Sequence, residues 1–379
     1  MLALWLACAQ PGTPLDTGLW GVPEHFPPAA VPQDNPMTPE KVELGRHLFY
    51  DPGLSVNGTR SCGICHEAAK GFTDGFVRAL GATNEMHPRN TLSLANVAWR
   101  EDLGWRGDAP SSLEEQVLVP LSGHDPLEMG MDWETLQPRL SQNPIYPPLW
   151  EAAYPGQEWN LEQVQQALAS FERSIVGGDS PYDRYLRDGT PLEPAAERGR
   201  QLFFSRELAC SRCHGGVFLD SPTSALGRVS ARHGYFNTGL YNVDGLGAYP
   251  ESEQGLIEVT GAPEDMGVFR TPSLRNVAQS GPWLHDGSAN DLGDVIDAYA
   301  RGGRRIESGP NPGDGAENPY KHRLIRGFEL SQQERSDLLA FLDALSDSSL
   351  MDDPRYQTPF CVVLQGEVQN APCVDDSAP

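Results

Sequence analysis

Two copies of the pattern C-x-x-C-H constrain this chain more than any other feature of its sequence. In each copy two thiols stand where they can form thioethers with the vinyl groups of a haem, and the adjacent imidazole can ligate the iron from one face. The pattern therefore predicts two covalently bound c-type haems. The residues that would hold them are Cys62, Cys65 and His66 in the first copy, and Cys210, Cys213 and His214 in the second.

A C-x-x-C pair is also half of a zinc site or a redox dithiol. Zinc sites tolerate variable spacing between their Cys and His ligands, whereas here a His directly follows the second Cys both times. Two matching copies favour haem attachment over zinc.

The two motifs lie in a duplicated context, which predicts two related domains. The segment ELGRHLF at 43–49 precedes the first motif, and RGRQLF at 198–203 precedes the second. The length of 379 residues suits two domains, each with its own core. The predicted division is an exported N-terminal segment or linker at 1–35, an N-terminal haem domain at 36–190, a C-terminal haem domain at 191–347 and a polar tail at 348–379.

Composition and local patterns predict a mainly α fold: two cytochrome c-like haem domains with long ordered loops. The chain has 39 Gly and 33 Pro but few strand patterns, so helices would be joined by loops that wrap the cofactors. Residues up to about 35 are Pro-rich and aperiodic, and are either a linker or an arm on the surface. The expected helices start at Thr38-Pro39, run from an Asn160 cap to Gly177-Gly178, and cover 195–203, 291–300 and the segment behind the capping box Ser331-x-x-Glu334.

The net charge of −24 argues against nucleic acid and anionic membrane surfaces as partners. The sequence contains no apolar run of the length of a membrane span, so no transmembrane segment is expected. The N-terminus MLALWLAC resembles the end of a secretory signal, and Leu6-Ala7-Cys8 resembles a lipoprotein cleavage site. We therefore expect a periplasmic or otherwise exported protein, with Cys8 as a candidate lipid anchor.

Cys361 and Cys373 are the thiols left over besides Cys8. In an oxidising compartment they would close a short C-terminal loop as a disulfide. The alternative is two free thiols.

The haem motifs and five further segments, in this order and spacing, resemble the bacterial di-haem cytochrome c peroxidase and MauG family, most closely its MauG-like (MbnH-like) branch. The resemblance runs from about Pro36 to Ser346. The further segments are WRGD at 105–108, LEEQ at 113–116, PLEMG at 126–130, FRTPSLRN at 269–276 and WLHDG at 283–287.

By this resemblance the N-terminal haem, held by His66, reacts with peroxide. Its distal pocket would be built from Gln116, Pro120 and Glu128. Glu128 fits an acid–base role that moves a proton from the inner to the outer oxygen of peroxide, and Gln116 would position the oxidant. The competing interpretation of Glu128 is a surface carboxylate.

In many family members a loop His caps the peroxidatic haem until the enzyme is reduced. The matching stretch here, 81–84, has no His, and His87 is the nearest. We therefore predict an open iron without prior activation, and interpret His87 as a surface residue, with ligation as the alternative.

The second ligand of the C-terminal haem falls, in the family, fourteen residues after the His of the His-Asp-Gly motif. Counting from His285 gives Tyr299, where cytochrome c peroxidases have Met and MauG-like members have Tyr. A hard phenolate favours Fe(III), whereas a neutral thioether favours Fe(II). The alternative is a core Tyr299, with Met266 or no residue as the ligand.

Trp105 matches the family's Trp between the haems, where an indole lets oxidising equivalents pass from one iron to the other. Core packing is its competing role. Trp283 is a second candidate, for passage toward the surface. The resemblance also implies a calcium ion between the domains, with Asn90 and the carbonyls of Ser280 and Pro282 among its ligands.

The resemblance implies a MauG-type enzyme that uses H2O2 to form a high-valent, bis-Fe(IV)-like state and oxidises a partner protein, with Trp-to-kynurenine conversion as the reaction of the MbnH-like members. One alternative is a peroxidase that reduces H2O2 with electrons from a small cytochrome or cupredoxin. A plain electron carrier with two six-coordinate haems is a third, against which a distal acid–base pocket argues.

Overall fold

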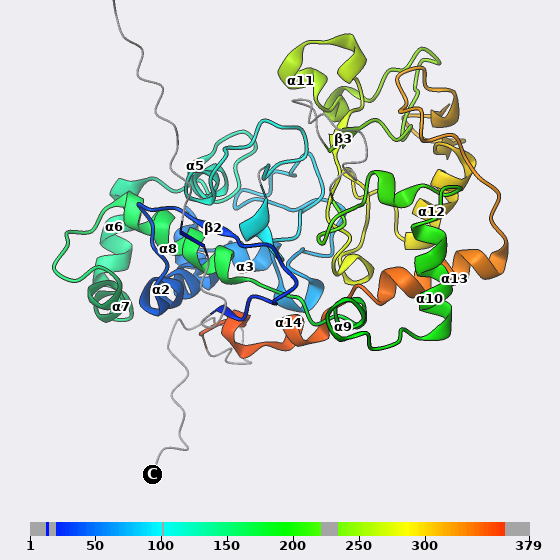
Figure 1. Ribbon diagram of the computed structural model, residues 1–379. Helices are drawn as coiled ribbons and strands as arrows, with labels where there is room; N and C mark the ends of the chain where they lie inside the picture. The colour runs from blue at the N-terminus through cyan, green and yellow to red at the C-terminus, as the bar shows by residue number, and fades with distance from the viewer. Residues whose placement is uncertain (1–12, 15–19, 101, 221–233, 361–379) are drawn as a thin grey trace, which may run out of the picture.

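The structure is a computed structural model that describes residues 13–14, 20–100, 102–220 and 234–360. Two lobes follow one another along the chain, and helices dominate both (Figure 1). The predictions for Cys8, Cys361 and Cys373 lie outside the described residues.

Helices and short strands alternate with long loops, so the mainly α prediction is confirmed. Each of the three sheets has two short antiparallel strands. The strands are β1 (Thr13–Pro14) with β2 (Ala30–Val31), β3 (Tyr235–Phe236) with β4 (Phe269–Arg270), and β5 (Arg305–Ile306) with β6 (Gly313–Asp314). The α-helices are α2 (Pro39–Tyr50), α3 (Cys62–Cys65), α4 (Leu113–Gln116), α5 (Leu118–Ser122), α6 (Trp133–Gln142), α7 (Tyr146–Ala153), α8 (Leu161–Ser174), α9 (Pro181–Asp188), α10 (Pro194–Phe203), α11 (Ile257–Thr260), α12 (Leu292–Arg301), α13 (Gln332–Asp343) and α14 (Ser348–Asp352). Within the described part of the chain, none of these helices is both long enough and apolar enough to cross a membrane.

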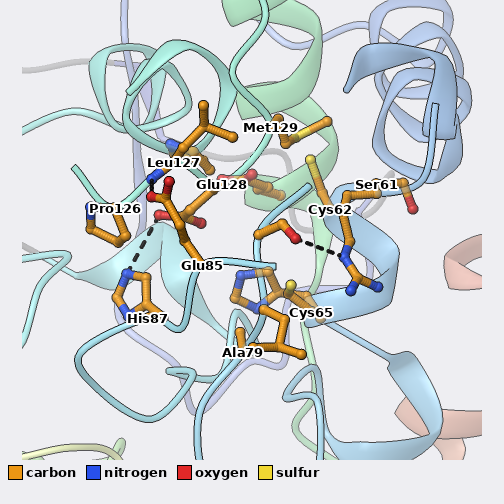
Figure 2. A pocket seen from close by; sticks show the side chains of 16 residues that line it. Ser61, Cys62, Cys65, Ala79, Glu85, His87, Pro126, Leu127, Glu128 and Met129 are labelled. Carbon is orange, nitrogen blue, oxygen red and sulfur yellow. Dashed lines mark hydrogen bonds and ion pairs between the residues drawn. The ribbon is translucent and has the colours of Figure 1, made fainter. Parts of the chain in front are cut away.

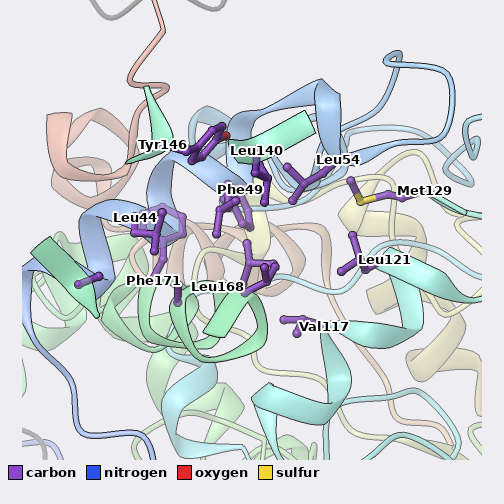
Figure 3. Packing of buried hydrophobic residues seen from close by; sticks show 14 of the residues in the cluster. Leu44, Phe49, Leu54, Val117, Leu121, Met129, Leu140, Tyr146, Leu168 and Phe171 are labelled. Carbon is purple, nitrogen blue, oxygen red and sulfur yellow. The ribbon is translucent and has the colours of Figure 1, made fainter. Parts of the chain in front are cut away.

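The N-terminal lobe is built on the crossing of α2 and α8. The two backbones approach so closely that a Cβ at Gly45 would lie 2.0 Å from the Ala167 carbonyl oxygen. Next to the crossing, the rings of Phe49 and Phe171 pack at 5.0 Å between centroids. Both rings are fully buried in the cluster drawn in Figure 3. Any side chain larger than hydrogen at position 45 would push the helices apart.

The C-terminal lobe repeats this arrangement with α10 and α13. A Cβ at Gly199 would lie 1.9 Å from the Asp337 carbonyl oxygen. Phe203 and Phe341 pack at 5.3 Å, as Phe49 and Phe171 do in the first lobe. The duplicated sequence therefore encodes a duplicated helix crossing, in which the Gly supplies the close approach and the Phe fills the core.

Residues 20–31 form an arm that buries its apolar side chains, rather than a linker. The ring of Phe26 packs edge-on against Trp99 and Phe218, at centroid distances of 5.4 and 5.0 Å. Because Trp99 precedes α4 and Phe218 follows the second haem motif, the arm contacts both lobes.

The prediction of a polar tail from residue 348 is wrong for residues 348–360. This segment contains α14 and returns to the N-terminal lobe (Figure 1), where Leu350, Tyr356 and Phe360 are buried. The Tyr356 hydroxyl donates a hydrogen bond to the Ser174 carbonyl at 2.6 Å. The apolar residues of 348–360 are spaced too widely to show a periodicity, so the sequence did not predict that this segment packs against the first lobe.

Asp183 joins the arm, α9 and the C-terminal lobe at one buried point. Its carboxylate accepts two hydrogen bonds from Arg275, at 2.7 and 2.8 Å, and further ones from Ser180 and His25. Burial opposes the charge of Asp183, but the hydrogen bonds and charge of Arg275, with Ser180 and His25, outweigh it and lower its pKa to about 2. The interaction therefore stabilises the fold above about pH 4 and is lost as the pH falls toward 2.

We predict that Asp183→Asn lowers the free energy of unfolding by about 3–5 kcal/mol, because it leaves the Arg275 charge buried without a counter-ion. Guanidinium unfolding followed by circular dichroism at pH 7 measures the loss. The matched control is Asp297→Asn, which breaks an exposed pair with Arg335 and should cost less than about 1 kcal/mol. Equal losses in the two variants would contradict the assignment.

Candidate haem sites

The first haem motif forms the short helix α3, and its His is held by the loop that follows. His66 Nδ1 donates a hydrogen bond to the Phe72 carbonyl at 3.0 Å. Phe72 has a φ of 63°, in the left-handed region that a bulky side chain rarely adopts. Burial lowers the pKa of His66, which keeps the imidazole neutral. With the proton on Nδ1, the Nε2 lone pair is available to a metal.

The second motif repeats this geometry. His214 Nδ1 donates to the Leu219 carbonyl at 3.1 Å, and Leu219 has a φ of 53°. Burial lowers the pKa of His214 to about 4. A strained residue that presents its carbonyl to the His at both motifs points to a shared requirement, namely the fixed tautomer of an iron ligand.

The four motif thiols and a set of unpartnered polar atoms fit two covalent haems. Cys62, Cys65, Cys210 and Cys213 are all free, so neither pair has closed as a disulfide. Between the lobes, Arg100 pairs with Asp220, yet its Nη2 is buried without a hydrogen-bond partner in the described chain. Burial, then the charges of Arg270 and Arg275, lower the pKa of Arg100 to about 9. A buried guanidinium nitrogen without a partner fits a carboxylate of the kind that a haem carries.

A cavity opens beside the first motif (Figure 2). Its lining includes Cys62, Cys65 and His66 of the motif together with Pro120 and Glu128. The structure thus brings two of the three predicted distal residues to this motif.

Gln116 does not line this cavity. It lies at the end of α4, one helical turn before Pro120, so the two side chains project in similar directions. Its Oε1 is buried and has no hydrogen-bond partner in the described structure. An unsatisfied buried amide oxygen is what a residue awaiting a ligand would show.

The residues that line this cavity without having been predicted there include one His and two Glu. His87, interpreted as a surface residue, lines it and lies 3.5 Å from Glu128. Glu85 also lines it, and its carboxylate accepts from the Leu127 amide at 3.0 Å. Glu172, on α8, is the third, and burial raises its pKa to about 8. Glu172 directly precedes Arg173 on a helix face whose other residues pack in the core, and nothing in the sequence indicated that it would line a cavity.

Tyr299 lies beside the second motif, on α12. Burial raises the pKa of its phenol, and the nearby thiols of Cys213 and Cys210 raise it further. Tyr299 is half-buried, and its hydroxyl forms no hydrogen bond among the described residues. The phenol is therefore close to the haem attachment site and available to a metal.

Trp105 and His285 meet where the two lobes join. Trp105 Nε1 donates to the Asn90 carbonyl at 2.8 Å, and its ring lies 6.4 Å from that of His285. The His285 ring stacks on Phe269 at 3.5 Å, and its buried Nε2 lies 3.2 Å from Glu253 without forming a hydrogen bond in the described structure. Trp105 thus lies where the two lobes meet, and both its place between the haems and its redox role stay predictions.

Trp283 packs against the core of the C-terminal lobe, and its Nε1 donates to the Val277 carbonyl at 2.7 Å. It is partly buried, which fits packing as well as a path toward the surface.

Asn90 is buried next to the segment that contains the other two predicted calcium ligands. Its amide N–H donates to the His285 carbonyl at 2.8 Å, and its side-chain nitrogen donates to the carbonyls of Phe76 and Val77. No hydrogen bond in the described structure ends on its Oδ1 or on the carbonyls of Ser280 and Pro282. These oxygens suit Ca²⁺, and the ion stays a prediction.

Comparison with known proteins decides the family. The chain is 35% identical over 326 residues to the methylamine utilization protein MauG of Methylorubrum extorquens, which covers 85% of this chain and 82% of that protein. The chain belongs to the di-haem cytochrome c peroxidase and MauG family. A family model described as di-haem cytochrome c peroxidase matches residues 39–190. Membership makes the protein a di-haem peroxidase-type oxidoreductase with two c-type haems.

Further relatives come from both branches of the family. The cytochrome-c peroxidase IdrP1 of Pseudomonas sp. (strain SCT) is 33% identical over 370 residues, covering 92% of this chain and 90% of that protein. The crystal structure of a MauG-like protein associated with microbial copper homeostasis is 42% identical, with a TM-score of 0.85, over 90% of this chain and 99% of that one. The di-haem peroxidase BthA of Burkholderia thailandensis shares the fold, with 20% identity and a TM-score of 0.64 over 96% of this chain and 98% of that one.

Proposed function

We propose that this family member works in the MauG manner: it uses H2O2 to accumulate oxidising equivalents on two haems and passes them to a partner protein. The observation that carries the proposal is Tyr299, whose unpartnered phenol lies next to the thiols of the second haem motif. A hard anionic ligand stabilises the oxidised iron, so it suits storage of oxidising equivalents better than uptake of electrons.

The loop over the first haem supports the same proposal. Residues 81–84, the stretch that matches the capping loop of other family members, contain no His, and the nearby His87 lies 3.5 Å from Glu128. We therefore expect no imidazole that would have to leave the iron before peroxide enters. When bound, the haem iron supplies the site at which peroxide is coordinated and its O–O bond is cleaved. Glu128 would take the proton from the inner peroxide oxygen and return it to the outer one, which leaves as water. Pro120 would narrow the cavity and restrict water, and the Gln116 amide would orient the oxidant.

For the substrate we propose a Trp of a copper-associated partner protein, which is converted to kynurenine. The support is the 42% identity to a MauG-like protein associated with microbial copper homeostasis. The partner would remain outside the haem pocket and be oxidised through the protein, with Trp105 as the relay between the haems. We further propose that the enzyme works after export, in the periplasm.

The second candidate is a cytochrome c peroxidase that takes electrons from a small redox protein. Met266 favours it, since this thioether packs against the cluster that contains Tyr249, a neighbour of Tyr299. The 33% identity to a cytochrome-c peroxidase supports this alternative too.

The deciding experiment adds one equivalent of H2O2 to the diferric enzyme without any electron donor and records the near-infrared and Mössbauer spectra. We expect a long-lived near-infrared band and a change at both irons. Rapid return to the starting spectrum, with turnover that depends on a reduced cytochrome, would contradict the MauG-type proposal and favour the second candidate.

A further inference from the structure

His87 points into the cavity of the first haem motif, toward Glu128 (Figure 2). Its Nε2 lies 3.5 Å from Glu128 Oε1, and the two side chains are 33% and 29% exposed. Among the described residues, this is the one polar partner of the Glu128 carboxylate. The second carboxylate oxygen is thus left for a ligand in the cavity.

The other side of the His87 ring is anchored by backbone. Nδ1 lies 3.1 Å from the Arg89 carbonyl and 3.3 Å from the Arg89 amide nitrogen. Nδ1 thus faces both an acceptor and a donor of the Arg89 backbone, which fixes the ring orientation and leaves Nε2 directed at Glu128. Burial opposes a positive charge on the ring, but the hydrogen bond and charge of Glu128 outweigh it and raise the pKa of His87.

The loop that contains His87 forms hydrogen bonds with the segment that contains Glu128. Ala82 N–H donates to the Glu128 carbonyl at 2.6 Å, and Leu127 N–H donates to Glu85 at 3.0 Å. The loop also closes on itself, because the His87 amide donates to the Ala79 carbonyl at 2.9 Å. The hairpin 79–87 is thus held in place by contacts to the segment that contains Glu128.

We propose that His87 is a positioning residue for Glu128: its Nε2–H holds Oε1, so that Oε2 is presented to a small protic ligand, such as hydrogen peroxide or hydrogen cyanide, in the cavity. This deepens the proposed function, and it rests on the acid–base role assigned to Glu128. A loop that in other family members would supply an iron ligand supplies here a hydrogen bond to the catalytic carboxylate.

The surrounding charges are compatible with this role. Arg89 is engaged by Glu258, at 2.9 Å, and Arg60 donates to the Gly81 carbonyl. The remaining titratable groups that line the cavity are Glu85, Glu172, His66 and the thiols of Cys62 and Cys65. None of them forms a hydrogen bond with the Glu128 carboxylate in the described part of the chain, so the His87 contact is the one that a substitution can remove selectively.

The test is the association rate of cyanide with the ferric holoenzyme, since HCN must give up its proton to a base in the pocket before it binds iron. This readout does not depend on turnover or on a partner protein. We expect His87→Ala to slow association by about tenfold, a fraction of the effect of losing the base itself. His87→Gln, which keeps a side-chain N–H donor, should recover part of the rate. His124→Ala is the matched control, because His124 is exposed on the segment before Glu128 and forms no hydrogen bond or ion pair with the Glu128 side chain among the described residues.

A double variant separates positioning from an independent effect. In a Glu128→Gln background, His87→Ala should cause no further loss, because the two residues act as one unit. An unchanged rate for His87→Ala alone, or equal losses in both backgrounds, would overturn the positioning role and leave the peroxidase function intact. Faster association in His87→Ala would identify His87 as an iron ligand and overturn it as well. If Glu128→Gln has no effect, the acid–base assignment falls and the positioning role with it.

Discussion

Glu128→Gln should slow peroxide cleavage by about two to four orders of magnitude, the effect expected when a general acid–base is lost. The substitution keeps the shape of the side chain and an oxygen that can still accept from His87, at the 3.5 Å contact. What it removes is the ability to take up a proton from peroxide. Stopped-flow spectroscopy of the ferric enzyme with H2O2 measures the rate constant directly.

Glu85→Gln is the control for this prediction. Glu85 lines the same cavity, and the Leu127 amide donates to its carboxylate, an interaction that a Gln oxygen preserves. The change removes one negative charge from the cavity, as Glu128→Gln does, so the rate should stay within a few-fold of the wild type. A large loss of rate in both variants would mean that peroxide cleavage depends on the total charge of the cavity rather than on a single base. An unchanged rate in Glu128→Gln would move the role to another carboxylate, with Glu172 the first to test.

Local patterns were sufficient to predict the helix starts of this chain. Thr38, Asn160 and Ser331 each cap a helix with the side-chain hydrogen bond that their residue type predicts. Because the information for a cap lies within four residues, the sequence contains all of it. The same holds for the haem motifs, since attachment residues and ligand occupy five adjacent positions.

Contacts between segments that are distant in the sequence were harder to predict. His87 and Glu128 come from two loops, and no periodicity connects them, so their pairing is visible only in the fold. The return of residues 348–360 to the first lobe depends on packing against α8 and against the loop after α3. No local sequence pattern describes such contacts. Gly45 and Gly199 are intermediate: the duplication drew attention to them, but only the helix crossings explain why both must be Gly.

The distal residues could be assigned only through the family resemblance. Pro120 and Glu128 do line the first cavity, whereas Gln116 stands just outside it with an unsatisfied amide oxygen. A spacing fixes which face of a helix a residue occupies, but not how far its side chain reaches. Here α4 is only one turn long, so its last residue depends on the following helix for its direction.

Tyr299→Met should raise the reduction potential of the C-terminal haem by a few hundred millivolts, within the roughly 0.8 V span that axial ligands produce. A phenolate is anionic and hard, so it stabilises Fe(III); a thioether is neutral and soft, so it stabilises Fe(II). Burial raises the pKa of the free phenol, so its deprotonation in this site requires a bond to the metal. A spectroelectrochemical titration of the two haems measures the shift. The long-lived near-infrared band after peroxide should disappear in the same variant, because the site that favours the oxidised iron is lost.

Two further variants decide what a null result would mean. Tyr249→Phe removes another buried hydroxyl of the same lobe, which bonds Asn237 at 2.9 Å, and should leave the potential unchanged. Met266→Leu should also leave it unchanged if Tyr299 is the ligand. Should Tyr299→Met have no effect while Met266→Leu lowers the potential, the thioether would be the ligand and Tyr299 a core residue. The enzyme would then be equipped to receive electrons from a small redox protein, because the potential of this one haem determines whether the pair stores oxidising equivalents or passes electrons to peroxide.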